Sequence, residues 1–235
     1  MTTGQDLEFL FLLALPLDGS MWAGQMALLP GATHAPTLYQ FGDSVEAWAA
    51  AALKQVKGNR LIVVGCSVGG SCAVELAIAA PDRVAALVLI GTKAAHRPDP
   101  AFHASALDTL QNRGLDDAWA AFWAPLFSAS ADSHVISDAK RLAVRQSRVD
   151  VARGVTAFHT RPSRGKCLGA VSCPVIVITG ADDTAPGPQV SAAQADCAPH
   201  GRFHIIPDCG HYVPLEKPEA LNAILRDLIA SLRRP

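Results

Sequence analysis

The sequence lacks an excess of charge of either sign, and this absence excludes one class of partner. Its 20 lysine and arginine residues nearly balance 21 aspartate and glutamate residues, so the formal net charge is −1, and no basic run occurs along the chain. Proteins that bind nucleic acids normally carry a basic patch that contacts the phosphates. We therefore expect no nucleic-acid partner.

Long hydrophobic runs are also missing. The apolar stretch near the N-terminus, 9–17, follows Asp6 and Glu8 instead of basic residues. It is much shorter than the roughly 20 residues that cross a bilayer as a helix. We interpret it as a buried strand, and we expect a cytoplasmic protein without membrane association.

The cysteines lack the spacing of a metal site. The sequence has no CxxC pair and no histidines at metal-ligand spacing from the cysteines, so we expect no metal. An even number of cysteines is compatible with disulfides, but without an export signal we expect buried or half-buried free thiols. The six are Cys66, Cys72, Cys167, Cys173, Cys197 and Cys209.

What the sequence does contain is a series of short hydrophobic segments that alternate with helix-like segments. Half of the 235 residues are hydrophobic and 17% are charged, which suits a sheet covered on both faces. The alternation predicts an α/β fold with a mostly parallel sheet of about six strands. Strands are predicted at 9–14, 61–64, 86–90, 175–179 and 203–206, with a weaker one at 37–41, and helices at 45–55, 70–80, 190–198 and 219–232.

One long segment, 94–171, has helical patterning and no convincing strand. We interpret it as a helical lid inserted into a core made of residues 1–93 and 172–235, with no second independent domain. Its aromatic residues have helical spacing, which fits a packed stripe, and substrate contact is the alternative. No charged cluster in the segment calls for a charged substrate. The stripe consists of Trp119, Phe122, Trp123 and Leu126.

The strongest chemical signal is a serine between two glycines. Ser67 lies in a Gly-x-Ser-x-Gly pattern directly after the strand at 61–64 and directly before an Ala-rich helix. A serine on a sharp turn from strand to helix needs small neighbours, and the helix N-terminus then faces the developing oxyanion. A phosphate-binding glycine turn is the alternative, but the chain has neither a GxxxxGK[ST] motif nor a GxGxxG motif after its first strand. We therefore predict that Ser67 is a nucleophile.

A serine nucleophile needs a base and a third group that orients the base. Of the eight histidines, His211 follows the strand at 203–206, at the carboxyl edge of the sheet where catalytic groups converge. We interpret the other seven as surface or packing residues. Asp182 and Asp183 directly follow the strand at 175–179, and from the pattern alone either one could orient His211.

These residues resemble the α/β-hydrolase superfamily, in its lid-bearing serine esterase and lactonase-like branch, and the resemblance covers nearly the whole chain. The order Ser, Asp, His is the one found in that fold. The family's Gly-x-x-Asp block matches the stretch that ends at Asp183, which implies that Asp183 is the acid. The family's Gly-His block, followed by a helix that opens with Pro-Glu, matches His211 and the Pro218-Glu219 pair.

The chain departs from the family at the oxyanion hole. Family members supply one N–H from a His-Gly loop after the first central strand. When the chain is aligned through Trp22, Leu13-Ala14 replaces that pair, so the resemblance implies that the backbone N–H of Leu15 is one donor and that of Val68 the other.

Together these observations predict a serine hydrolase that cleaves a small, largely apolar carboxylic ester or related acyl bond through an acyl-enzyme, without a cofactor. Carbamate, amide, lactone or carbon–carbon bond hydrolysis on the same triad is the alternative, and a ligand-binding receptor of this fold is a further one. The expected partner is a small-molecule substrate, and the sequence does not indicate the oligomeric state. The apolar pocket residues are predicted to include Trp22, Trp119, Trp123 and Val213.

Overall fold

The computed structural model describes residues 7–234. Two parts of the expected core lie outside the described residues: residues 1–6, which include Asp6, and Pro235. Six strands form one sheet in the order β2-β1-β3-β4-β5-β6, and each of the five neighbouring pairs is parallel. The strands are β1 (Glu8–Leu12), β2 (Thr33–His34), β3 (Leu61–Cys66), β4 (Val84–Ile90), β5 (Val175–Gly180) and β6 (Gly201–Ile206).

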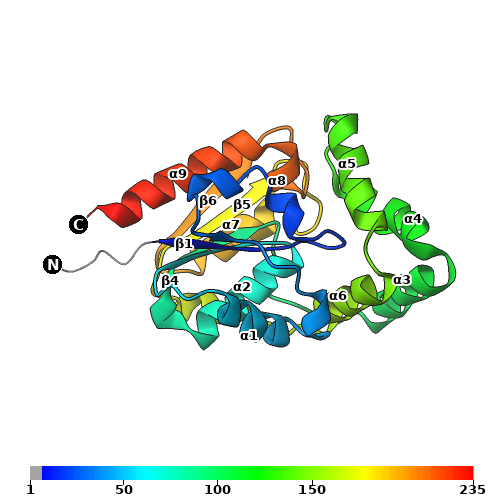
Figure 1. The fold of residues 1–235 in the computed structure, drawn as a ribbon, viewed down its shortest axis with the longest axis horizontal. Coiled ribbons are helices and arrows are strands. Elements are labelled where there is room, and N and C mark those ends of the chain that lie inside the picture. Colours follow the sequence, from blue (N-terminus) through cyan, green and yellow to red (C-terminus); the bar gives the residue numbers. More distant parts are fainter. Residues whose placement is uncertain (1–6, 235) are drawn as a thin grey trace.

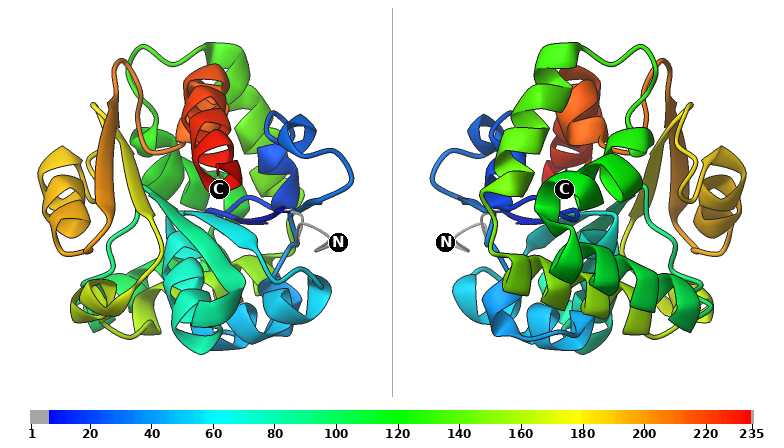
Figure 2. Two further views of the ribbon diagram at one scale, coloured as in Figure 1. Left: turned by 90° about the vertical axis from the view of Figure 1, so that its left-hand side faces the viewer. Right: turned by 90° about the vertical axis from the view of Figure 1, so that its right-hand side faces the viewer.

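Helices cover both faces of this sheet. Helices α1 (Val45–Gln55), α2 (Val68–Ala79) and α7 (Pro188–Asp196) lie on one face, while α8 (Val213–Glu216) and α9 (Pro218–Arg233) lie on the other (Figures 1 and 2). Strands β3 and β5 are therefore buried along their whole length, which explains their continuous apolar sequence. The strands, the helices and their order confirm the predicted α/β-hydrolase fold.

Local sequence signals set the helix ends. The Ser44 side chain accepts a hydrogen bond from the Ala47 N–H at 3.2 Å and caps α1, which spans the predicted residues 45–55. Helix α9 begins at Pro218, a residue suited to the first helical turn. It buries Leu221, Leu225 and Leu228 on one side, as expected of an amphipathic helix that covers a sheet.

The weaker strand predicted at 37–41 is wrong. The sixth strand is β2, and residues Tyr39–Phe41 form a 3₁₀ turn instead. Tyr39 is buried, its hydroxyl donates to the Leu17 carbonyl at 2.5 Å, and its ring packs edge-on against Trp48. These tertiary contacts outweigh the strand preference of the local sequence.

The segment 94–171 folds into helices without a strand, as its patterning predicts. Figure 1 shows its helices beyond the carboxyl ends of the strands, on the right of the view. A bidentate ion pair from Arg164 to Glu75 of α2, at 2.7 and 3.1 Å, ties the end of the segment to the core. The insertion helices are α3 (Pro100–Asn112), α4 (Gly114–Ala118), α5 (Ser133–Val144) and α6 (Arg148–Thr160), with a π turn at Trp119–Trp123 and 3₁₀ turns at Ala124–Leu126 and Gly165–Ala170.

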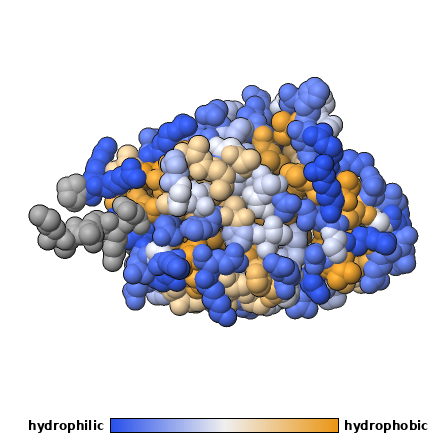
Figure 3. All heavy atoms as spheres, viewed as in Figure 1, coloured by the Kyte–Doolittle hydropathy of each residue, from blue (hydrophilic) through white to orange (hydrophobic). Residues whose placement is uncertain are grey.

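The surface and the thiols agree with a globular chain. On the face seen in Figure 3, hydrophobic atoms form separate patches among polar ones, some of them at the end where the insertion helices lie. All six cysteines are free; Cys197 is exposed and the others are buried or half-buried. Among residues 7–234, no helix has the length and apolar character needed to cross a membrane.

Candidate active site

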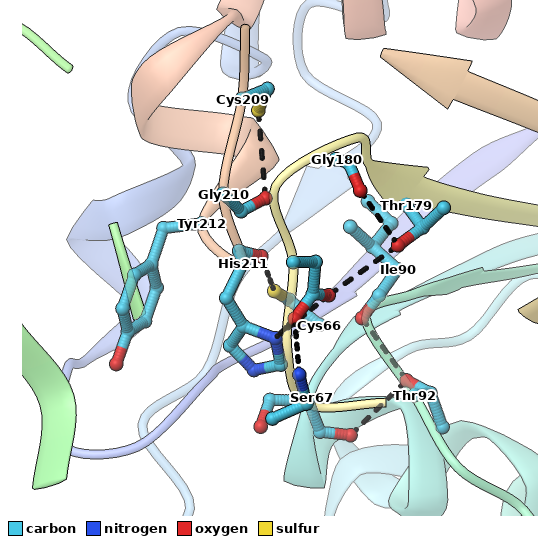
Figure 4. A network of polar contacts seen from close by, with 12 residues as sticks. Cys66, Ser67, Ile90, Thr92, Thr179, Gly180, Cys209, Gly210, His211 and Tyr212 are labelled. Atoms are coloured by element: carbon cyan, nitrogen blue, oxygen red, sulfur yellow. Dashed lines mark hydrogen bonds and ion pairs between the residues drawn. The ribbon is translucent and has the colours of Figure 1, made fainter. Parts of the chain in front are cut away.

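Ser67 lies on the turn between β3 and α2 in a conformation that few side chains adopt. Its φ is 55° and its ψ is −120°, so it is one of two non-glycine residues with positive φ in the described chain. The Ser67 N–H donates to the Ile90 carbonyl at 2.8 Å, and the Ser67 carbonyl accepts from the Thr92 hydroxyl at 3.1 Å (Figure 4). Such strain persists only where the surrounding structure holds it in place, and it is typical of a nucleophile turn.

Glycines make this turn possible. A Cβ atom at Gly65 would overlap the backbone of Gly69, and one at Gly69 would overlap the carbonyl groups of Leu12 and Leu13. The Gly-x-Ser-x-Gly pattern is therefore a steric requirement of the close approach between β1, β3 and α2.

His211 and Asp183 form a buried pair. The Nδ1 atom of His211 lies 3.0 Å from Asp183 Oδ2 and 3.1 Å from Oδ1, and the two residues are 2% and 3% exposed. Asp183 also accepts a hydrogen bond from the Ala185 N–H at 2.8 Å, which fixes the carboxylate. This geometry can hold one imidazole tautomer, with Nδ1–H on the carboxylate and Nε2 available as a base.

The other aspartate has a different partner. Asp182 accepts a hydrogen bond from the Ser128 hydroxyl at 2.5 Å, whereas the hydrogen bonds of the His211 ring to a carboxylate go to Asp183. The structure thus pairs His211 with the residue that the family resemblance selects.

The loop that carries His211 is held by contacts that the sequence analysis missed. The Glu216 carboxylate accepts hydrogen bonds from the backbone N–H groups of Gly210 and Ser128, both at 3.0 Å, and from that of Tyr212 at 3.3 Å. Glu216 lies in α8, one turn after the histidine, and this spacing is the only sequence signal that could have identified it.

Gly91, directly after β4, is a second missed residue. Its φ is +54°, and a Cβ atom there would lie 2.8 Å from His211 Nδ1 and 3.1 Å from Asp183 Oδ2. The glycine therefore leaves room for the His–Asp pair.

The buried thiol of Cys66, next to Ser67, is a weak hydrogen-bond donor and not a thiolate. Burial raises the pKa of the Cys66 thiol well above its ordinary value, with the nearby Asp183 charge adding to the effect. The Cys66 thiol therefore stays protonated, and its Sγ lies 3.8 Å from the His211 carbonyl oxygen.

The two backbone groups expected at the oxyanion hole lie near Ser67. Val68 is the first residue of α2, so its N–H has no acceptor within the helix. Leu15 lines the same cavity as Ser67, and its carbonyl accepts a hydrogen bond from the Tyr212 hydroxyl at 2.8 Å. Tyr212 directly follows His211, so this hydrogen bond links the Leu15 loop to the histidine loop. The link is present although the sequence of the Leu15 loop departs from the family pattern.

Ser67 and His211 face a cavity of about 460 Å³, within the usual range for small-ligand sites. Figure 4 shows the two side chains arriving from different loops. The insertion segment supplies much of the opposite wall through Phe102, Phe122, Trp123 and residues of α6.

Three of the residues expected in the pocket are packed in the interior instead. Trp22 is fully buried and its ring stacks on Phe11 at 4.7 Å. Trp119 packs against Phe127, and Val213 is fully buried at the start of α8. None of the three lines the cavity, so their predicted placement is wrong, whereas Leu15 and Trp123 do line it.

The aromatic stripe divides between the interior and the cavity wall. Trp119, the first residue of the π turn, is buried against Phe127, while Phe122, Trp123 and Leu126 line the cavity. Packing and cavity lining, which were alternatives in the sequence, each apply to part of the stripe.

The cavity wall is also more polar than the sequence indicates. Two histidines interpreted as surface or packing residues, His96 and His159, line the cavity together with Lys93, Arg97 and Arg161. Burial lowers the pKa of both histidines, that of His159 to about 4, so both are neutral near pH 7. Within residues 7–234, no three histidine, cysteine or carboxylate side chains gather as metal ligands.

Comparison with known proteins agrees with this architecture. The family model described as "Alpha/beta hydrolase family" matches residues 9–224. An esterase from Thermogutta terrifontis, solved with malate bound, superposes with a TM-score of 0.87 at 26% identity, over 99% of this chain and 92% of the esterase.

Two sequence relatives cover most of the chain. The provisionally named non-heme bromoperoxidase BpoC of Mycobacterium tuberculosis is 28% identical over 73% of this chain and 68% of its own length. A 2-hydroxy-6-oxononadienedioate/2-hydroxy-6-oxononatrienedioate hydrolase of Cupriavidus pinatubonensis is 25% identical over 76% of this chain and 65% of its own. The chain belongs to the alpha/beta hydrolase family of enzymes.

Proposed function

We propose that this enzyme hydrolyses small carboxylic esters with a largely apolar body, through Ser67, His211 and Asp183. The observation that supports the proposal most is the buried pair of His211 and Asp183, 3.0 Å apart, whose histidine lines the same cavity as a serine on a strained turn. A nucleophile, a base and an orienting carboxylate in this arrangement are the parts that acyl transfer requires.

In the first step, Ser67 Oγ attacks the ester carbonyl carbon while His211 Nε2 accepts the hydroxyl proton. The carbonyl oxygen becomes an oxyanion, which the backbone N–H groups of Leu15 and Val68 stabilise. The bond to the leaving oxygen then breaks, and His211 returns its proton to the departing alcohol. An ester of Ser67 remains.

In the second step, His211 accepts a proton from a water molecule, whose oxygen attacks the acyl carbon. Collapse of the second oxyanion breaks the bond to Ser67, and the proton on His211 returns to Ser67 Oγ. The carboxylic acid leaves, and the enzyme is restored without a redox step. In this scheme Asp183 keeps its charge and stabilises the imidazolium.

We also propose that the 94–171 segment acts as a lid over a catalytic core made of residues 1–93 and 172–235. The aromatic side chains of the segment line the cavity opposite Ser67, which supports an apolar substrate body. Free cysteines are typical of a reducing compartment, so a cytoplasmic location fits the chain.

The test is intact-protein mass spectrometry after treatment with a fluorophosphonate probe, combined with turnover of short 4-nitrophenyl esters. We expect one adduct on the wild-type chain and none on Ser67→Ala or His211→Ala, and a loss of turnover of several powers of ten in both variants. Ester turnover by Ser67→Ala at the wild-type rate would refute the assignment. An unlabelled, folded wild-type protein that binds esters without cleaving them would favour a receptor.

The turnover assay also distinguishes which type of bond the enzyme cleaves. Because the Cupriavidus relative is named for an oxononadienedioate substrate, that compound is included beside matched carbamates and lactones. Faster turnover of any of these than of simple esters would reassign the substrate while retaining the triad.

A further inference from the structure

Arg161 is a buried cation on the cavity wall without a carboxylate partner. It is the residue after α6, it is only 6% exposed, and it lines the same cavity as Ser67 and His211. No ion pair involves Arg161 within residues 7–234. A buried charge without a counter-charge is costly, so its persistence calls for an explanation.

The protein satisfies only one edge of this guanidinium. Nη1 donates to the Phe158 carbonyl, and the Phe158 ring lies under the group with Cζ 4.0 Å from the ring centroid. Nε is buried and has no hydrogen-bond partner among the described residues. The unsatisfied edge is therefore the one formed by Nε and Nη2.

Another arginine of this chain binds a carboxylate through the same edge of its guanidinium. Three residues further on, Arg164 uses Nε and Nη2 to hold both oxygens of Glu75, at 2.7 and 3.1 Å. This bidentate geometry matches a carboxylate, with its two oxygens in one plane. Arg161 has the same donors and lines the cavity, and because its Nε is fully buried, Nη2 is the donor left for a ligand there.

The charge around Arg161 also favours an anion. Lys93 and Arg97 line the cavity as well, and the only carboxylate on its wall, Asp99, accepts a hydrogen bond from the Phe102 N–H at 2.9 Å as the cap of α3. Burial lowers the pKa of Arg161 to about 10, so its guanidinium remains charged at neutral pH. The cavity is therefore positive although the whole chain has a net charge of −1.

We propose that the substrate carries a carboxylate, remote from the bond that is cleaved, which binds the guanidinium of Arg161 through Nη2. This inference rests on the proposed function, because it assigns the substrate class of the same site. The aromatic wall then contacts the body of the substrate between the carboxylate and the ester.

The first test compares esters that differ only by this group. 4-Nitrophenyl half-esters of succinate, glutarate and adipate are paired with 4-nitrophenyl esters in which a methyl group replaces the carboxylate, and 4-acetoxybenzoate is paired with 4-methylphenyl acetate. We expect kcat/KM of the wild type to be higher for the charged member of at least one pair, roughly tenfold or more.

Arg161→Gln should lower kcat/KM for that charged ester roughly ten- to hundredfold, mainly through KM, and leave the neutral ester within about twofold. Arg161→Lys should restore part of the preference, since a lysine keeps the charge but not the paired donors. Arg153→Gln is the matched control. Arg153 lies exposed on α6, pairs with Asp150 at 2.9 Å and is away from the cavity, so neither ester should respond.

A binding experiment separates this inference from the proposed function. Calorimetry with glutarate, and with the dicarboxylate nearest in length to the preferred half-ester, is performed on Ser67→Ala and on Ser67→Ala with Arg161→Gln. We expect saturable binding to the first protein and at least a tenfold weaker affinity for the second.

Arg161-dependent binding without ester turnover by the wild type would overturn the proposed function and retain the carboxylate site. Turnover without preference for any charged ester, or an equal loss on both members of each pair in Arg161→Gln, would overturn the carboxylate site and retain the esterase.

Discussion

Replacing Gly91 by alanine tests whether the His211–Asp183 pair has the role that its position indicates. The new Cβ would lie 2.8 Å from His211 Nδ1 and 2.9 Å from Cε1, where ordinary contacts begin near 3.4 Å. The imidazole must therefore move by roughly half an ångström or turn out of plane. The φ of +54° adds a backbone strain of about 1 kcal/mol for any L side chain.

The displaced imidazole and the backbone strain are expected to change different quantities. Misplacement of the base by this amount should lower kcat roughly ten- to hundredfold, whereas the strain should lower the free energy of unfolding by about 1 to 2 kcal/mol. The assays are steady-state turnover of a 4-nitrophenyl ester and urea unfolding followed by fluorescence.

Gly31→Ala is the control for the strain alone. Gly31 has a φ of +78°, and no atom lies within 4 Å of the position of its added Cβ. This variant should lose about 1 kcal/mol of stability and keep its kcat. If Gly91→Ala retained the kcat of Gly31→Ala, the His–Asp contact would not limit catalysis and the reasoning would be wrong.

Three further predictions concern neighbouring groups. Asp183→Asn should lower kcat by about four powers of ten, because the amide selects the wrong imidazole tautomer, whereas Asp182→Asn should stay within about tenfold of the wild type in the same ester assay. Glu216→Gln should lower kcat roughly tenfold with little change in KM, because the histidine loop loses charged acceptors, while Glu219→Gln, at an exposed site on α9, should not, as steady-state kinetics would show. The pKa of His159 falls from 6.5 to about 4 on folding, so protonation favours the unfolded state between these pH values, and stability is lost as the pH falls through that window. His159→Gln should remove at most about 3 kcal/mol of this pH dependence, measured by urea unfolding from pH 7 to pH 4, and an unchanged slope would contradict the burial argument.

The features that short stretches of sequence determine were predictable. Helix α1 has its cap, its apolar residues and its end within one segment, and the prediction at 45–55 matches the structure. The turn at Ser67 depends on glycines two residues away on either side, so a local pattern identifies it. In such cases the interactions that decide the structure are close in sequence.

The failures involve partners that are distant in sequence. The segment 37–41 has strand-forming residues, but the hydroxyl of Tyr39 binds Leu17 and its ring packs on Trp48. Trp22 looked like a pocket residue and instead fills the core against Phe11. Neither outcome can be derived from composition or periodicity, because each depends on which surfaces meet in the folded chain.

The positive charge of the cavity could not be predicted from the sequence either. Along the sequence, Lys93, Arg97 and Arg161 do not form a cluster, so the insertion gave no indication of a charged substrate. In the structure they line one cavity, because the segment leaves the sheet after β4 and returns to it after α6. Arg164 meets Glu75 on that return, while Arg161, three residues earlier, meets no carboxylate. Arg164 is half-buried with an internal carboxylate partner, whereas Arg161 is buried without one, and this difference is the basis for proposing that Arg161 binds a substrate carboxylate.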